Sequence, residues 1–573
     1  MITMPRLLTP ERQQRSDPAG GWIGIAGGVI LAASAFLPWA YSFTALDGMT
    51  LLGYPSPLQY FGMVLGLLVA GLIICSRRIK PKGKKIRVGW VRGAKAAGTG
   101  ALVYIAIIIL SIAVELGGLI NVVYGGWIAL LGALLAFAGT RLMIPDQPPT
   151  LYQAQTRPWL EILIIAVVMG AALFATAFAL NIDDGGTFVS FIAFLGTFVA
   201  VLFRVGVMGF LSGVSQRHRK VLILAAFVVA FLFPFTQGGS DANMSIATQV
   251  IIFAAAAMGL NITVGLAGLL DLGYIAFLGA GAFTAAVLSR SAFATADIHP
   301  PFIVVVLIAG MVSATLGLII GSPTLRVSGD YLAIVTLAFG EIFRITMINL
   351  DGEAGPNITH GSNGIPAIPD LVLFGFDFGD PHVALGIPLG RFSNYYFLLL
   401  VLIAFVILVF VRLNNSRIGR GWVAIREDEK AAEAMGVNVF GLKLFAFASG
   451  AFLAGVAGAV KAHQDISVTP DQFIFLESAF LLAAVVLGGM GTVLGVLVGA
   501  TVLKLLPEKL RFVSDFRLMI FALLLIIMMR FRPEGMIPSQ RRQLEFHEED
   551  EALAERIEEE VEETGALKGA GVL

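Results

Sequence analysis

The chain has 573 residues, of which 57% are hydrophobic and only 14% are charged, and its mean hydropathy is +0.85. These values exclude a water-soluble, fibrous or disordered protein and indicate an integral membrane protein. The single cysteine, Cys75, excludes an internal disulfide, and the six histidines show no ligand spacing. A formal net charge of zero hides a basic stretch at 77–95 and an acidic tail at 545–563.

A helix needs about twenty apolar residues to cross the hydrocarbon core of a bilayer. The first part of the chain contains six such runs, at 22–38, 58–75, 98–116, 119–139, 160–180 and 187–211. The remainder contains ten, at 221–235, 246–270, 272–288, 302–320, 331–349, 396–411, 445–462, 475–487, 491–506 and 518–529. The expected fold is therefore an all-α polytopic membrane protein with roughly 16 hydrophobic segments. Several are short and interrupted by glycine, as half-helices or re-entrant segments are.

The distribution of Lys and Arg predicts sidedness, because basic residues in short loops stay in the cytoplasm. Basic loops at 77–95 and 217–220 then lie inside, as do 412–443 and the C-terminal tail, and 351–391 lies outside. Lys509 and Arg511 are exceptions, since this count places them outside. A polar start before a first run of full spanning length is unlike a cleaved signal peptide, so we expect a retained, cytoplasmic N-terminus.

A basic loop after six spans predicts three regions: 1–215, 216–540 and the acidic cytoplasmic tail 541–573. The tail carries an apolar line at Leu553, Ile557 and Val561, which predicts a short helix. This line suits docking to a partner, but a solvated tail is the more common use of such charge runs.

The segment 416–436 predicts an amphipathic cytoplasmic helix ending in glycine. Carboxylates at 427–429 precede alanines at 431, 432 and 434, so small side chains permit close approach and charges can orient a contact. Docking into another protein and a plain surface helix fit this composition equally well.

Polar residues interrupt three later spans. Glycines and Asp271 break the run at 259–273, which fits either a capped hairpin or the broken helices of transporters. Glu341 and Arg344, at i and i+3, are placed to pair with each other, although an intramembrane carboxylate also suits a translocation path. Glu477, near the start of another span, allows the same two interpretations.

Several motifs are missing from the sequence. It contains no phosphate-binding Gly-x-x-x-x-Gly-Lys-Ser/Thr loop, no His-Glu-x-x-His and no Gly-x-Ser-x-Gly. No span carries regularly spaced arginines or paired histidines, which disfavours a voltage sensor, a haem protein or a quinone enzyme. ATP hydrolysis by this chain alone is not expected.

Residues 221–538 resemble the LivM-type permease subunits of branched-chain amino acid ABC importers. The matching stretches occur in the family's order and read GLNITVGLAGLLDLGYIAF, LRVSGDYLAIVTLAFGEIFRI, GPNITHGSNGI, SRIGRGWVAIREDEKAAEAMGVN, VTPDQFIFLESAF, VVLGGMGTVLG and FRPEGMIP. The first 215 residues depart from this pattern, and no role is derived for their six spans.

The resemblance implies that 216–540 is an ABC permease domain with a helix that couples it to the ATPases. This coupling helix would comprise Arg426, Glu427, Asp428, Ala431, Glu433, Ala434 and Gly436. Candidate residues of the translocation path are Asn261, Asp271, Tyr331, Glu341 and Glu477. Candidate contacts to an external binding protein are Asn357, Ser362 and Asn363.

The expected partners are a LivH-type permease or a second copy, two cytoplasmic ATPases, an extracytoplasmic binding protein and membrane lipid, but no nucleic acid. ATP and Mg²⁺ would be used by the partner subunits, and this chain would hold no cofactor or metal. The expected location is the bacterial inner membrane. The expected function is non-enzymatic import of branched-chain or related amino acids, with urea, amides or another small organic solute as the alternative. An ion-coupled secondary transporter using Glu341 or Asp271 is a further hypothesis, and a membrane enzyme the weakest.

Overall fold

The structure is a computed structural model that describes residues 10–40, 57–78, 87–151, 156–182, 185–296, 298–324, 330–353, 355–384 and 386–509, with 519, 522–523, 526–527, 530 and 535–537. Within these residues, twelve helices are long and apolar enough to cross a membrane, and 18–34 and 275–287 form shorter apolar helices. The expected polytopic all-α class is confirmed. The predicted span 518–529 and the tail helix around 553–561 lie largely or wholly outside the described residues.

The chain forms two compact units. Unit 1 comprises Met1–Gly238 with Lys509–Phe512, and unit 2 comprises Gly239–Glu508 with Val513–Leu573. The division follows α8 (Arg219–Thr236), which packs against α5 (Pro158–Asn181) within unit 1. The boundary drawn from the sequence, at 215/216, lies one helix earlier, inside α7 (Val207–Arg217).

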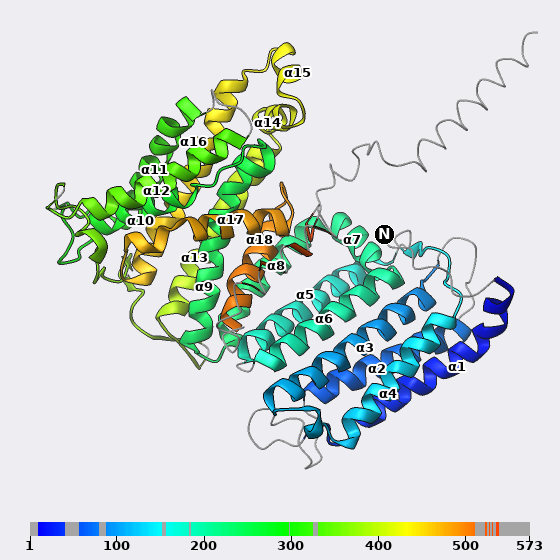
Figure 1. The fold of residues 1–573 in the computed structure, drawn as a ribbon. Coiled ribbons are helices and arrows are strands. Elements are labelled where there is room, and N and C mark those ends of the chain that lie inside the picture. Colours follow the sequence, from blue (N-terminus) through cyan, green and yellow to red (C-terminus); the bar gives the residue numbers. More distant parts are fainter. Residues whose placement is uncertain are drawn as a thin grey trace, which may run out of the picture. The chain divides into compact units, whose positions relative to one another are not determined.

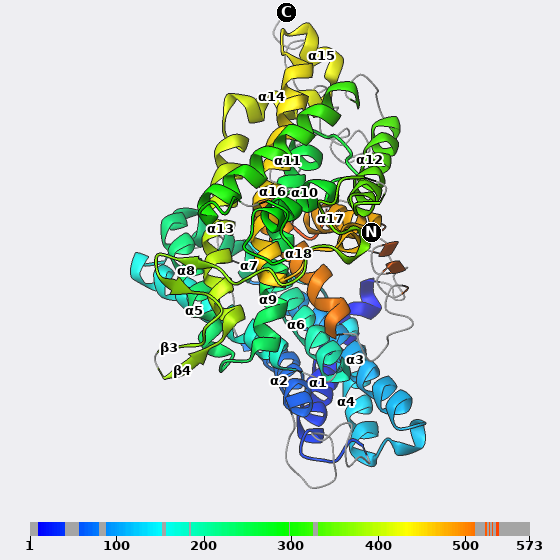
Figure 2. The same cartoon turned by 90° about the vertical axis from the view of Figure 1, so that its left-hand side faces the viewer.

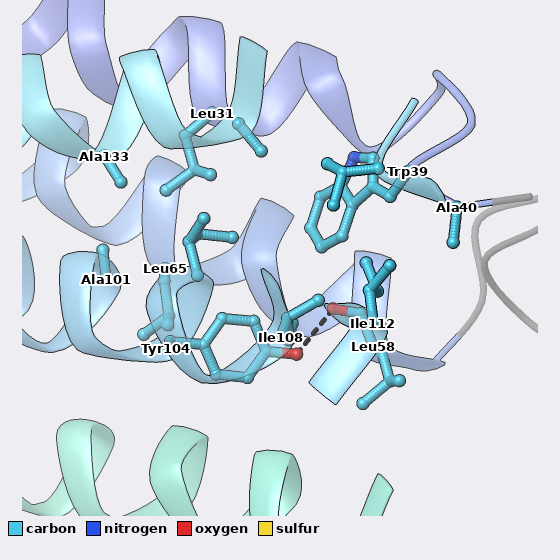
Figure 3. Packing of buried hydrophobic residues seen from close by; sticks show 13 residues of the cluster. Leu31, Trp39, Ala40, Leu58, Leu65, Ala101, Tyr104, Ile108, Ile112 and Ala133 are labelled. Carbon is cyan, nitrogen blue, oxygen red and sulfur yellow. Dashed lines mark hydrogen bonds between the residues drawn. The ribbon is translucent and has the colours of Figure 1, made fainter. Parts of the chain in front are cut away.

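Unit 1 is a helical bundle. Its other helices are α1 (Pro10–Ser34), α2 (Pro57–Arg78), α3 (Trp90–Glu115), α4 (Tyr124–Leu142) and α6 (Gly185–Val205), with a short 3-10 helix, η2 (Leu119–Asn121). Helices α1 to α4 lie side by side in Figure 1. Their core includes Leu31, Trp39 and Tyr104 (Figure 3). The two polar aromatic groups are satisfied there, since Tyr104 donates to the Leu58 carbonyl at 2.7 Å and Trp39 to the Ser34 carbonyl at 2.8 Å.

Glycines allow α1 and α4 to touch along their backbones. A Cβ atom added at Gly27 would lie 2.3 Å from the Ala136 nitrogen, and one at Gly139 would lie 2.3 Å from the Gly24 nitrogen. Small residues at such crossings replace the hydrophobic driving force that is missing in lipid with close van der Waals packing.

Unit 2 contains helices and two short β-hairpins. Its helices are α9 (Asp241–Leu260), the π-helix η4 (Asn261–Leu266), α10 (Ile275–Val287), α11 (Phe302–Thr324), α12 (Asp330–Asn349), η5 (Gly361–Asn363), α13 (Arg391–Asn414), α14 (Arg417–Glu427), α15 (Glu429–Ala434), α16 (Val439–Asp465), η6 (Pro470–Phe473), α17 (Phe475–Gly488) and α18 (Val493–Lys509). Its strands form two antiparallel hairpins, β1 (Val372–Leu373) with β2 (Phe376–Asp377), and β3 (His382–Ala384) with β4 (Ile387–Leu389).

The connectivity of α13 defines two ends of unit 2. Strand β4 precedes α13 and α14 follows it, so the hairpins and α14–α15 lie at opposite ends, as Figure 2 shows. We call these the β4 end and the α15 end. Helix α16 returns from the α15 end, and near its last residues Arg391 donates to the carbonyls of His463 and Gln464 at 2.9 and 3.0 Å.

Two α-helices are by themselves shorter than a full span, although α17 reaches 19 residues together with η6. The predicted span 272–288 is a helix only over α10, which has 13 residues, and α17 has 14. Each adjoins a break in the regular α-helices: the first break comprises the π-helix η4 and residues 267–274, between α9 and α10, and the second comprises 489–492, between α17 and α18. Glycines force these breaks, because Gly268, Gly489 and Gly491 adopt positive φ angles of 72°, 125° and 77°.

Candidate functional site

The proposed coupling segment is two helices instead of the single helix expected for 416–436. Asp428 separates α14 from α15 with an extended backbone (φ −152°, ψ 108°), and its carboxylate accepts a hydrogen bond from the Ala431 N–H at 3.0 Å. Asp428 is therefore the N-cap of α15, which satisfies an N–H that would otherwise lack a partner. The sequence-based interpretation took it for a docking charge inside a continuous helix and missed the cap.

Helix α15 presents an exposed surface. Ala431, Glu433 and Ala434 are exposed, whereas Ala432 is buried. The segment ends at Gly436, whose φ of +82° is typical of a helix C-terminus. Lys443 of α16 lies 2.6 Å from the Glu429 carboxylate and fixes the helix to the bundle.

Helix α14 is anchored by a residue that the sequence analysis did not single out. Trp422 is fully buried, donates to the Leu442 carbonyl at 2.7 Å and stacks on Phe445 with ring centroids 6.0 Å apart. A tryptophan in an otherwise charged helix was the available signal, since its indole N–H usually finds a partner when buried.

Arg426 points into unit 2, where it meets the first break. Its Nη1 donates to the Gly265 carbonyl of η4 at 2.7 Å, and its Cγ would lie 2.7 Å from a Cβ added at Gly268. Arg426 therefore connects α14, which directly precedes the exposed helix α15, to the first break. Arg426 thus belongs to this internal connection, whereas the sequence analysis grouped it with the docking residues.

Asn261 joins the two breaks to each other. It is fully buried, its Oδ1 accepts from the Gly491 N–H at 2.8 Å, and its Nδ2 donates to the Thr492 carbonyl at 3.4 Å. A helix break leaves backbone groups unpaired inside a membrane, and an amide side chain can satisfy both a donor and an acceptor.

Asp271 lies in the first break with 1% of its surface exposed. One carboxylate oxygen accepts from the Gly273 N–H at 3.1 Å, and the other is buried without a hydrogen-bond partner in the described part of the chain. Helix α10 starts at Ile275 with Tyr274 at its N-cap position and no side-chain cap. The expectation that Asp271 caps this helix is wrong, because it closes a turn two residues long instead.

Two other candidates for the path lie on α12. Glu341 pairs with Arg344, whose Nη2 lies 2.5 Å from its carboxylate, and Arg344 also reaches Asp471 of η6 at 3.2 Å. The predicted i, i+3 pair is confirmed. Tyr331 is 69% exposed in the first turn of α12, on the surface of the described chain. Among the described residues, neither side chain has a hydrogen bond or ion pair to Asn261 or Asp271, although α12 packs on the first break, where the Leu272 N–H donates to the Thr336 hydroxyl at 3.0 Å.

Glu477 lines a cavity of about 160 Å³ in unit 2. It pairs there with Lys504 of α18, whose Nζ lies 2.9 Å from its carboxylate. The other lining residues are Gln249, Ile252, Phe253, Ile275, Leu278, Lys461 and Gln472. Lys461 and Lys504 were not singled out from the sequence, although two cations inside apolar spans were signal enough.

The candidate binding-protein loop lies toward the β4 end. Asn357, Ser362 and Asn363 are all exposed around η5. The loop is tied down by Ile365, which exchanges two backbone hydrogen bonds with Val468 at 2.9 and 3.1 Å. These three side chains are thus available to a partner.

Membrane-length helices, two breaks joined by a buried amide and a charged cavity beside them define this chain as a polytopic transport permease. Residues 243–529 match the family described as the branched-chain amino acid transport system / permease component. The chain belongs to this family. The match begins after the end of the continuous part of unit 1, at residue 238.

Curated relatives agree with the family match. The chain is 39% identical to LivM, a high-affinity branched-chain amino acid permease protein of Salmonella typhimurium, over 346 residues that cover 58% of this chain and 78% of the relative. Identity to Escherichia coli LivM is 38% with the same coverage. The ribose import permease RbsC of Haemophilus influenzae is 27% identical, with coverage of 55% and 91%. No solved structure matches the chain significantly.

Proposed function

We propose that this chain is the membrane permease subunit of an importer for branched-chain or related amino acids, driven by ATPases on separate subunits. The family match carries the proposal. The contacts of α14 and α15 supply a route for coupling, because an exposed helix is connected through Arg426 to the break at Gly265.

The partners follow from this assignment. Relatives include LivH of Escherichia coli, 32% identical over 126 residues, which suggests a LivH-type second permease or a second copy of this chain. ATPases with ATP and Mg²⁺ would dock at the α15 end, and a binding protein at Asn357, Ser362 and Asn363. The α15 end and both termini would face the cytoplasm of a bacterium, with unit 2 spanning its inner membrane.

The alternative is import of another small organic solute. It is supported by the ribose permease among the relatives, since the same permease type serves a solute of different chemistry there. An ion-driven mechanism that uses Glu341 has less support, because Glu341 is already paired with Arg344.

A pull-down tests the ATPase-driven function. We expect wild-type chain from detergent-solubilised membranes to bring down ATPase subunits, and Glu433→Arg to lose most of them, because the reversed charge lies on the exposed face of α15. The matched control is Glu353→Arg, the same change at an exposed residue of the loop after α12, toward the β4 end, which should keep ATPase recovery. Failure of the wild type to recover any ATPase would refute the proposal.

A further inference from the structure

The cavity that contains Glu477 is half-open and is lined by residues of unit 2, between the two breaks and the β4 end. Its walls come from α9, α10, α16, η6, α17 and α18. Ile275 is the first residue of α10, directly after the first break, and Lys461 lies in the last turns of α16. A solute in this cavity would therefore lie on the β4-end side of the hydrogen bond between Asn261 and Gly491.

The polar groups around the cavity are two oppositely charged pairs. Lys504 lies 2.9 Å from Glu477 and 4.6 Å from the centre of the Phe253 ring. Lys461 pairs with Asp465, one turn further along α16, and Gln249 donates to the same Asp465 at 2.8 Å. Two cations and two carboxylates leave the surroundings without net charge.

A further polar side chain, Gln472, lines the cavity and carries a buried oxygen without a hydrogen-bond partner in the described part of the chain. The Oε1 atom of Gln472 is buried and accepts no hydrogen bond from the described residues, while its Nε2 donates to the Ser467 carbonyl at 3.4 Å. Buried acceptors are almost always satisfied, so a ligand donor is a natural partner for this one. Gln472 and Glu477 line the same cavity.

The rest of the wall is apolar. Ile252 and Phe253 face the cavity from α9, and Ile275 and Leu278 face it from α10. A volume of about 160 Å³ is small compared with the ~300–1,000 Å³ of pockets for drug-sized ligands, so it suits a single small solute.

We propose that this cavity is a binding site for a zwitterionic α-amino acid with an apolar side chain, which deepens and rests on the proposed importer function. The ligand carboxylate is held by Lys504 and Lys461, its ammonium by Glu477 with Gln472 beside it, and its side chain by Phe253 and Leu278. A net-neutral solute that carries both charges matches this set.

The charged pairs favour this ligand class over a sugar or urea. Removing ions from water costs several kcal/mol each, and a neutral solute that needs only hydrogen bonds would be served by neutral donors and acceptors. Lys504 and Glu477 pair with each other in the structure. When a zwitterion enters, each of its ends replaces one partner of the pair, so no charge is left uncompensated.

The test is ATP-driven uptake of radiolabelled leucine by the complete importer in proteoliposomes. We expect Glu477→Gln and Lys504→Gln each to lower uptake by about tenfold or more, since each removes a hydrogen bond to an ionised ligand group. Arg412→Gln, an exposed charge in the last turn of α13, is the control and should keep wild-type uptake.

A purely structural ion pair is distinguished by two double variants. Glu477→Met with Lys504→Met keeps the volume without charge, and Glu477→Lys with Lys504→Glu restores a pair in reversed order. We expect both to recover ATPases in the pull-down yet to take up leucine about tenfold or more slowly. Wild-type uptake in either variant would overturn the proposal, and the swapped variant decides the question if the double Met variant does not assemble.

The importer function itself is checked separately by the wild type. If the wild-type complex takes up ribose or urea with ATP and takes up no leucine, the proposed substrate class fails. If it takes up leucine and the Glu477 and Lys504 variants do so equally well, the importer function stands and only this cavity assignment is refuted.

Discussion

Replacing Gly265 with alanine is expected to destabilise unit 2 and to abolish transport. A Cβ atom at this position would lie 1.9 Å from the Asn261 Oδ1 atom and 2.7 Å from the Gly491 backbone nitrogen. The Asn261 side chain would have to move. Its Oδ1 atom accepts a hydrogen bond from the Gly491 N–H at 2.8 Å, and this bond would be disturbed. We therefore expect a loss of about 1–3 kcal/mol in the free energy of unfolding, typical of overpacking, measured as a lower midpoint of thermal denaturation in detergent.

The control for this variant is Gly170→Ala. Gly170 lies within α5, and an added Cβ would meet nothing within 4 Å. Alanine is the better helix former there by about 0.5–1 kcal/mol, so the midpoint should stay or rise. Equal midpoints for Gly265→Ala and the wild type would show that the two breaks are not packed as tightly as these distances require.

The break at 259–273 was visible in the sequence because its glycines and Asp271 interrupt an apolar run. What the break contacts was not visible. Asn261 and Gly491 are 230 residues apart in the chain, and no local pattern pairs an asparagine in one span with a glycine turn in another. For the same reason a helix cap, the common local role, stayed one of two interpretations for Asp271, although α10 begins four residues later at Ile275.

The coupling segment shows the same limit on a shorter scale. Its amphipathic character and its final glycine were predicted correctly, because they follow from residue spacing. The break at Asp428 was missed, since an aspartate inside a charged helix and an aspartate that caps a new helix look alike in sequence. Trp422 and Lys443, which set the position of α14 and α15, depend on tertiary contacts.

Of the residues that line the cavity, the sequence singled out Glu477 alone. Glu477 was chosen because a carboxylate at the start of a span is costly unless it has a function or a partner. The same cost applies to cations inside a span, so the same reasoning would also have selected Lys461 and Lys504. Glu341 passed the same criterion and yet lies outside the cavity, paired with Arg344. The free-energy cost of burying a charge identifies residues that need a partner. Only the fold shows whether that partner is a neighbouring side chain or a bound ligand.

Replacing Arg426 with methionine is expected to uncouple ATP hydrolysis from transport. The guanidinium donates to the Gly265 carbonyl at 2.7 Å, and this contact connects α14 to the break that leads to Asn261 and Gly491. A hydrogen bond from a charged group contributes about 1.5–3 kcal/mol, so its loss allows α14 and the break to move independently. Leucine uptake should fall by about tenfold or more, while the pull-down still recovers ATPases because α15 keeps its exposed residues.

Arg426→Lys is the matched control, since a lysine ammonium can donate to the same carbonyl but lacks the planar fork of arginine. We expect it to restore part of the uptake lost in the methionine variant. ATPase activity is the decisive measurement. In Arg426→Met, ATP hydrolysis should continue, but its rate should respond little to the loaded binding protein. Loss of ATPase recovery together with uptake would instead place Arg426 in the docking surface, as the sequence first indicated, and would remove the mechanical connection between α15 and the break.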